Sequence, residues 1–119
     1  MTTQEILEAA RAAKTAVALS DGTTRNAALC GMADALGAPE HLDAILAANA
    51  EDMAAAKGKI SDVMLDRLAL TPQRITAMAK GIRDVAALPD PVGRVLSRIQ
   101  RPNGLLIEKT AVPMGVIAI

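Results

Sequence analysis

The stretch Val112-Pro113-Met114-Gly115-Val116-Ile117-Ala118-Ile119 decides the fold class of this 119-residue chain. A short, continuous apolar run of this kind is typical of a strand that is buried on both faces of a parallel sheet. Parallel strands are joined by crossover connections, and none follows this stretch. An independent domain rarely ends in an uncovered apolar strand. The sequence therefore predicts that residues 113–119 are the truncated start of a larger α/β sheet.

The segment before this run has the pattern of a β-hairpin. Residues 95–100 alternate with the two-residue period of a strand, and a second strand-like run covers residues 105–112. Asn103-Gly104 lies between the two runs, and this dipeptide is a strong hairpin signal. We expect an exposed two-stranded ribbon over residues 94–112, which needs a further surface to pack on because isolated hairpins are marginally stable.

Helical periodicity dominates the chain up to the connector that begins at Pro89. Capping residues, prolines and glycines predict the ends of the helices. The expected helices are residues 3–19, a helix capped by Thr23 or Thr24 that ends at Gly37, residues 39–57, a helix from Ser61 to Leu68, and residues 72–88. Without aromatic side chains, Ala, Leu, Ile, Val and Met must form the core, so we expect the helices to pack closely and shallowly.

The composition narrows the possible functions. The chain has 13 Lys+Arg, 13 Asp+Glu and 0% aromatic residues, which excludes modules that stack nucleic-acid bases on aromatic rings. One Cys and one His cannot form a Cys/His zinc site. There is no apolar leader and no membrane-length apolar run. We expect a soluble cytoplasmic chain without a metal, nucleic-acid or membrane partner, and its single Cys suits a reducing compartment.

The segment from Leu65 to Gly93, which includes Leu65-Asp66-Arg67-Leu68-Ala69-Leu70-Thr71-Pro72 and Leu88-Pro89-Asp90-Pro91-Val92-Gly93, carries a family resemblance. It resembles the glutamate-5-semialdehyde dehydrogenases, also called gamma-glutamyl phosphate reductases, of the aldehyde dehydrogenase superfamily. Residues 45–53 are similar to a stretch shared across that superfamily, and residues 101–105 and 108–117 fit the family again. The resemblance covers almost the whole chain.

The resemblance implies an oxidoreductase of proline biosynthesis, a branch of amino-acid biosynthesis. The family reduces L-glutamyl 5-phosphate to L-glutamate 5-semialdehyde with NADPH and releases phosphate. A cysteine thiolate displaces the phosphate, and hydride from NADPH reduces the resulting thioester. Family members are several times longer than this chain, and their nucleophilic cysteine lies far beyond residue 119. We therefore expect an N-terminal fragment that is inactive alone and contains no catalytic, cofactor-binding or metal-binding residue.

The resemblance also implies a division of the chain. Residues 1–93 correspond to the helical N-terminal part of the cofactor-binding domain, and residues 94–112 to a hairpin arm that joins a partner subunit of a homo-oligomer. Residues 113–119 correspond to the first strand of a Rossmann-like dinucleotide-binding sheet. Ile119 then lies near the cofactor without being a site residue.

Three polar or reactive side chains have both a functional and a structural interpretation. Cys30 lies in an apolar helical stretch without a nearby base or cation, which favours a buried, unreactive thiol over a nucleophile. His41 follows Pro39-Glu40 in the first turn of a helix, and we expect it to be solvated. Asn49 lies on an apolar helical stripe, where we expect its amide to cap a neighbouring chain segment.

The remaining motifs favour structural roles. Gly93 and Gly115 form no phosphate-binding glycine fingerprint, and Met32, Met53 and Met78 have the spacing of core residues rather than of metal ligands. A function of another class remains open from the sequence, namely a non-catalytic helical module that acts in binding or oligomerisation through its ribbon.

Overall fold

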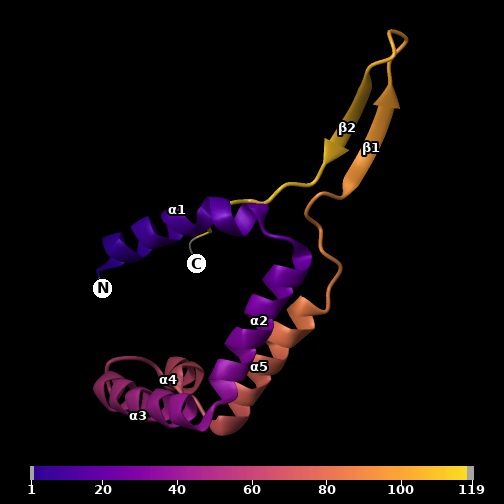
Figure 1. Cartoon of the computed structure of the whole chain (residues 1–119). Coiled ribbons are helices and arrows are strands. Elements are labelled where there is room, and N and C mark those ends of the chain that lie inside the picture. The colour runs from indigo at the N-terminus through magenta and orange to yellow at the C-terminus, as the bar shows by residue number, and fades with distance from the viewer. Residues whose placement is uncertain (1, 118–119) are drawn as a thin grey trace. The chain divides into compact units, whose positions relative to one another are not determined.

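The computed structural model describes residues 2–117 and contains helices followed by a two-stranded antiparallel sheet (Figure 1). The elements are α1 (Thr3–Leu19), α2 (Gly22–Gly37), α3 (Pro39–Ala56), α4 (Asp62–Leu68), α5 (Pro72–Ala86), β1 (Val95–Gln100) and β2 (Leu106–Thr110). They form two compact units, one made of residues 1–25 and 89–119 and the other of residues 26–88. The fold is therefore mostly helical, with one β-hairpin.

Local sequence signals fix the helix starts. The Thr2 side chain accepts a hydrogen bond from the Glu5 amide while the Glu5 carboxylate accepts one from the Thr2 amide, which is a capping box. Ser61 caps α4, Thr71 caps α5, and Pro39 is the first residue of α3, as the sequence predicts. The expected cap of α2 was wrong. Asp21, rather than Thr23 or Thr24, accepts the Thr24 amide at 2.7 Å, so this helix begins at Gly22.

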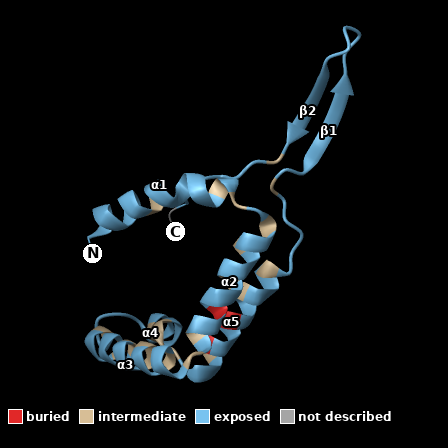
Figure 2. Cartoon of the chain, in the orientation of Figure 1, coloured by how far each residue is buried: buried red, intermediate tan, exposed pale blue. Residues whose placement is uncertain are grey.

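The unit of residues 26–88 contains a small buried core between α2 and α5. Ala33, Ile75 and Ala79 are 0%, 1% and 4% exposed (Figure 2). Asp34 on α2 also forms a salt bridge with Arg83 on α5. The buried residues found are two alanines and one isoleucine, so the core is shallow, as expected from the missing aromatic residues.

The hairpin confirms the strand and turn predictions. Strands β1 and β2 pair so that Ile99 faces Ile107 and Arg98 faces Glu108. The Arg101 amide donates to the Leu105 carbonyl at 2.8 Å. Gly104 has φ 85°, which glycine adopts without a steric penalty. Every residue of both strands is exposed, as expected for an arm without a packing surface.

The strand expected over residues 113–119 is not observed in its described part. Residues 111–117 have no regular secondary structure, and positions 118–119 lie outside the described residues. Val112, Met114 and Ile117 are 75%, 89% and 63% exposed. A strand exists only with a hydrogen-bonded neighbour, and no segment among residues 2–117 pairs with this one. The burial of this segment between strands of a larger sheet therefore stays a prediction.

Two of the three expected core methionines are also on the surface. Met32 and Met78 are 58% and 48% exposed, whereas Met53 is half-buried. Periodicity places these residues on the apolar faces of their helices, but the small core covers only part of each face.

Candidate functional site

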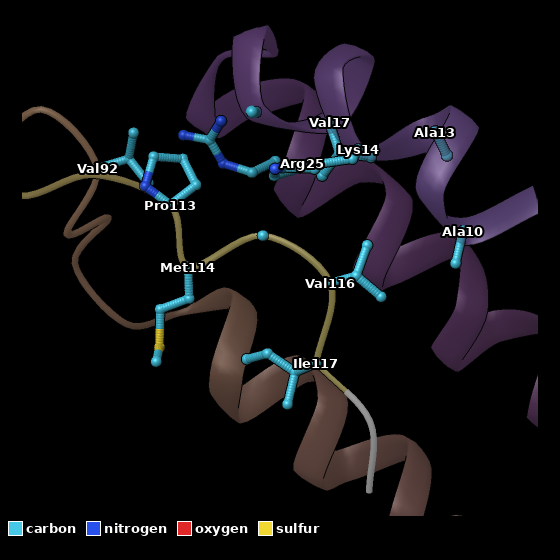
Figure 3. Close-up of a pocket in the computed structure, with 12 residues that line it drawn as sticks. Ala10, Ala13, Lys14, Val17, Arg25, Val92, Pro113, Met114, Val116 and Ile117 are labelled. Carbon is cyan, nitrogen blue, oxygen red and sulfur yellow. The ribbon is translucent and has the colours of Figure 1, made fainter. Parts of the chain in front are cut away.

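A mainly apolar cavity of about 440 Å³ is the candidate site, and it lies between α1 and the segment of residues 113–117 (Figure 3). Its volume is within the range of ligand and cofactor sites, about 300–1,000 Å³. The lining residues are Ala10, Ala13, Lys14, Val17, Ala18, Arg25, Val92 and residues 113–117. Two of these side chains are cationic and none is acidic, so the cavity combines apolar walls with positive charge.

Lys14 lies across the backbone of the C-terminal segment. A Cβ atom added at Gly115 would lie 3.3 Å from Cε of Lys14, and Gly115 has φ 93°. Only glycine combines this backbone conformation with this close approach at low cost. Gly115 thus lets the lysine stem pack against the segment and place its ammonium group at the cavity.

Arg25 joins three parts of the same unit. Its guanidinium group donates to the Ser20 carbonyl at the end of α1 and forms a salt bridge with Asp90 in the connector before the ribbon. Gly22 makes room for this arrangement, because a Cβ atom there would lie 2.7 Å from Oδ2 of Asp90. This contact could not be predicted from the sequence, since an isolated arginine 65 residues from its partner belongs to no local motif.

Hydrogen bonds lower the pKa of two aspartates in this unit. The Val92 amide donates to Asp90 at 3.0 Å and, together with Arg25, holds the pKa of that carboxyl below 3.8. Thr24 donates to Asp21 and lowers its pKa in the same direction. Both carboxylates are therefore ionised at neutral pH and act as structural acceptors.

The connector also holds the base of the ribbon. The Gly93 amide donates to the Ala111 carbonyl at 2.9 Å, and the Ala111 amide donates to the Arg94 carbonyl at 2.9 Å. Since Asp90 is bonded to Arg25, the start of α2, the connector and the ribbon base form one hydrogen-bonded junction beside the cavity.

Asn49 performs the capping role that the sequence predicts. Its side-chain amide donates to the Leu68 carbonyl at 2.9 Å and accepts from the Leu70 amide at 2.8 Å. Arg74 holds the other side of the same loop by donating to the Ala69 carbonyl at 2.7 Å. The two hydrogen bonds of Asn49 hold α3 to the α4–α5 loop. The Asn49 side chain therefore has a structural role.

The structure confirms the expectation for His41 but not the one for Cys30. His41 is exposed, as expected, and one ring nitrogen lies 2.9 Å from the Ala35 carbonyl at the end of α2. Cys30 is exposed, so the expected core position is wrong. Ala33 is the buried residue of this helix instead. No hydrogen-bonded base or ion pair activates Cys30 among residues 2–117, and the site contains no acid–base pair that could carry out covalent catalysis.

The helices described by the structure include none that is long and apolar enough to span a bilayer. The described residues likewise hold no cluster of three or more His, Cys, Asp or Glu side chains suited to a metal ion.

Comparison with known proteins confirms the family resemblance. The chain is 57% identical over 116 residues to gamma-glutamyl phosphate reductases of Streptococcus pneumoniae strains Hungary19A-6 and R6, a match that covers 98% of this chain and 27% of each relative. No protein-family model matches the chain. The crystal structure of gamma-glutamyl phosphate reductase from Thermotoga maritima is similar at 32% identity and a TM-score of 0.83, over 92% of this chain and 26% of that one. The fold thus matches an N-terminal part of such an enzyme.

Proposed function

We propose that this chain is the N-terminal part of a cytoplasmic gamma-glutamyl phosphate reductase that uses NADPH to convert L-glutamyl 5-phosphate to L-glutamate 5-semialdehyde and phosphate. The observation that carries the proposal is the 57% identity over 98% of the chain to enzymes of which it spans 27%. The relatives are longer proteins, and their name describes the whole enzyme. We therefore assign the activity to the complete enzyme and not to these 119 residues.

The residues described here supply a framework rather than the reaction. The only thiol, Cys30, has no activating partner among residues 2–117. In this proposal no residue of the chain holds the dinucleotide, and the packing of Lys14 against Gly115, the one glycine of residues 112–117, supports it. The nucleophile and the groups that hold NADPH therefore belong to other parts of the enzyme in this proposal.

The chain's own contribution is to position neighbouring elements. We propose the division into a helical part at residues 1–93, a ribbon at residues 94–112 that joins a partner subunit, and the first strand of a Rossmann-like sheet at residues 113–119. The exposure of both ribbon strands and of the apolar segment after Val112 supports these two packing roles.

A chimera tests the proposed function. This chain replaces the matching N-terminal part of the Streptococcus pneumoniae enzyme, and the product is assayed for phosphate-dependent NADPH formation from glutamate semialdehyde. We expect activity within about tenfold of the parent enzyme, because the chain keeps the same fold. The 119-residue chain alone is the control and has no activity. A soluble, folded chimera without activity, or turnover by the chain alone, contradicts the proposal.

A further inference from the structure

The turn of the ribbon contains the one asparagine of the chain that precedes a glycine, Asn103-Gly104. The other two asparagines, Asn26 in α2 and Asn49 in α3, each precede an alanine. Glycine has no side chain to hinder the approach of its backbone nitrogen to Cγ, the amide carbon of the preceding asparagine. Asn103 therefore has the least hindered route to a reaction between its side chain and the backbone.

The hydrogen bonds of the turn hold these two groups apart. The Gly104 amide donates to the Arg101 carbonyl at 2.9 Å, and the Leu105 amide donates to Oδ1 of Asn103 at 3.2 Å. Asn103 does not have a positive φ, so the turn is of type I rather than type II. In a type I turn the ψ angle of this residue is about 0°, which directs the Gly104 nitrogen away from Cγ. The two groups therefore meet only when both hydrogen bonds break.

The ribbon offers little resistance to this opening. Every residue of β1 and β2 is exposed, and so are residues 101–105 of the turn. The side-chain contacts between the strands are Ile99 with Ile107 and the salt bridge of Arg98 with Glu108. A two-stranded hairpin without a packing surface is marginally stable in water. Such an element opens locally without unfolding of the helices, and the opened turn is accessible to water.

We propose that Asn103 is a site of spontaneous covalent modification, at which the side-chain amide becomes a carboxylate when the turn of the ribbon opens. The Gly104 nitrogen loses its proton and attacks Cγ of Asn103. A nitrogen–carbon bond forms, and the side-chain amino group takes up a proton and leaves as ammonia. Water then opens the cyclic imide at either of its carbonyl groups, which gives aspartate or isoaspartate. No oxidant or reductant takes part.

The charge of the ribbon favours the first step. Residues 94–112 contain four Lys and Arg side chains against one Glu. An excess of positive charge near the turn stabilises the nitrogen anion that the attack requires. The reaction needs no other part of an enzyme, so it is independent of the proposed function.

The two products change the ribbon to different extents. Both place a negative charge in the turn. Isoaspartate also adds one methylene group to the backbone between Arg101 and Leu105, whose backbone hydrogen bond of 2.8 Å closes the hairpin. The longer connection no longer fits the pairing of β1 with β2. We expect the amides of both strands to exchange at least fivefold faster in the isoaspartate form than in the unmodified chain.

Incubation of the full chain at mildly alkaline pH, followed by mass spectrometry of tryptic peptides, tests the proposal. Asn103 lies in the peptide of residues 99–109, since trypsin does not cleave before proline. We expect Asn103 to be converted at least tenfold faster than Asn26 or Asn49. In guanidinium chloride, where the hairpin is unfolded, its conversion should be at least threefold faster again. No conversion at Asn103, or equal rates at the three asparagines, overturns the proposal.

Matched variants separate the local chemistry from the opening of the ribbon. Gly104→Ala adds a β-carbon beside the reacting nitrogen and should slow the conversion at least tenfold, although it also strains the turn. Ile107→Ala removes the contact with Ile99 and should speed the conversion at least threefold. Ile60→Ala, in the loop before α4, is its control and should leave the rate unchanged. Circular dichroism confirms that each variant keeps its helices.

Two further outcomes decide against the proposal. An unchanged rate in Gly104→Ala would show that the conversion does not pass through attack by the Gly104 nitrogen. Equal rates in the unchanged chain, in Ile107→Ala and in guanidinium chloride would show that opening of the ribbon does not control the reaction. Hydrogen exchange of the isoaspartate form, separated by reversed-phase chromatography, measures the effect on the strands, and unchanged exchange there contradicts the expected loss of pairing.

Discussion

Asn49 is the side chain whose structural role is most clearly defined in this molecule. It is half-buried and meets both a donor and an acceptor of the α4–α5 loop, at Leu70 and Leu68. An amide on an apolar stripe must find such partners, and this requirement is visible in the sequence. The exposure of Cys30 is not visible in the sequence. Helical periodicity shows which residues share a face but not how much of that face a neighbouring element covers.

The first residue-scale prediction concerns Asn49→Ala. This change leaves the Leu68 carbonyl and the Leu70 amide without their partner, so we expect the free energy of unfolding to fall by about 2 kcal/mol. Urea denaturation measures it. Asn26→Ala, at an exposed helical position, is the control and should leave stability unchanged or slightly raised. A loss below about 0.5 kcal/mol for Asn49→Ala would show that water replaces both bonds.

The second residue-scale prediction concerns acid sensitivity at the Arg25–Asp90 pair. The folded chain lowers the pKa of Asp90 below 3.8, first through the Val92 amide and then through Arg25. The unfolded carboxyl therefore binds protons more readily, so its contribution to stability is complete above pH 3.8 and is lost as the pH falls through the lowered pKa. Asp90→Asn should flatten the fall of the melting temperature between about pH 5 and pH 2.

The control for this pH experiment is Asp52→Asn, at an exposed position on α3 that forms no salt bridge within residues 2–117. It should keep the acid-induced fall of the wild-type chain. Identical pH profiles for the two variants would argue against a role for Asp90 in the junction.

Among the elements, the hairpin depends most on local chemistry. The Asn103-Gly104 turn, the pairing of β1 with β2 and the left-handed conformation of Gly104 all follow from a pattern in a short stretch of sequence. The last apolar stretch behaves in the opposite way. Residues 113–117 have strand composition but form no strand, because β structure requires a partner that local sequence does not provide.

The element-scale prediction compares two Gly→Ala changes. At Gly104 (φ 85°), alanine is strained, so we expect a loss of about 1 kcal/mol in hairpin stability and about fivefold faster amide exchange in β1 and β2. At Gly31 in α2 there is open space, and alanine is the better helix former, so we expect a gain of up to about 1 kcal/mol. Hydrogen exchange followed by mass spectrometry measures both. Faster exchange of the hairpin in the Gly31 variant would contradict the local origin of the effect.

At the scale of the whole molecule, exposed apolar surface is the dominant feature. The buried apolar residues found are Ala33, Ile75 and Ala79, while many large apolar side chains are exposed (Figure 2). Surface of this kind favours association. We therefore expect the isolated chain to self-associate, with the ribbon as one of the contacting surfaces.

The prediction at this scale compares Ile107→Lys with Ile60→Lys. Ile107 lies on β2 and is 47% exposed, whereas Ile60 lies in the loop before α4 and is 40% exposed. A lysine on a ribbon strand opposes edge pairing, so Ile107→Lys should shift the chain toward monomer by at least about tenfold in dissociation constant, a change of about 1.4 kcal/mol. Sedimentation velocity over a concentration series measures this. A sharp monomer peak for the unchanged chain would refute self-association.

Local sequence is sufficient to predict the helices, the caps at Ser61 and Thr71, the hairpin and the role of Asn49, because each depends on residues close in the chain or on the local need to satisfy a buried polar group. The exposure of Cys30, the contact of Arg25 with Asp90 and the packing of Lys14 over Gly115 are visible only in three dimensions. Those outcomes depend on which surfaces meet in three dimensions, and periodicity along the chain does not specify the neighbour.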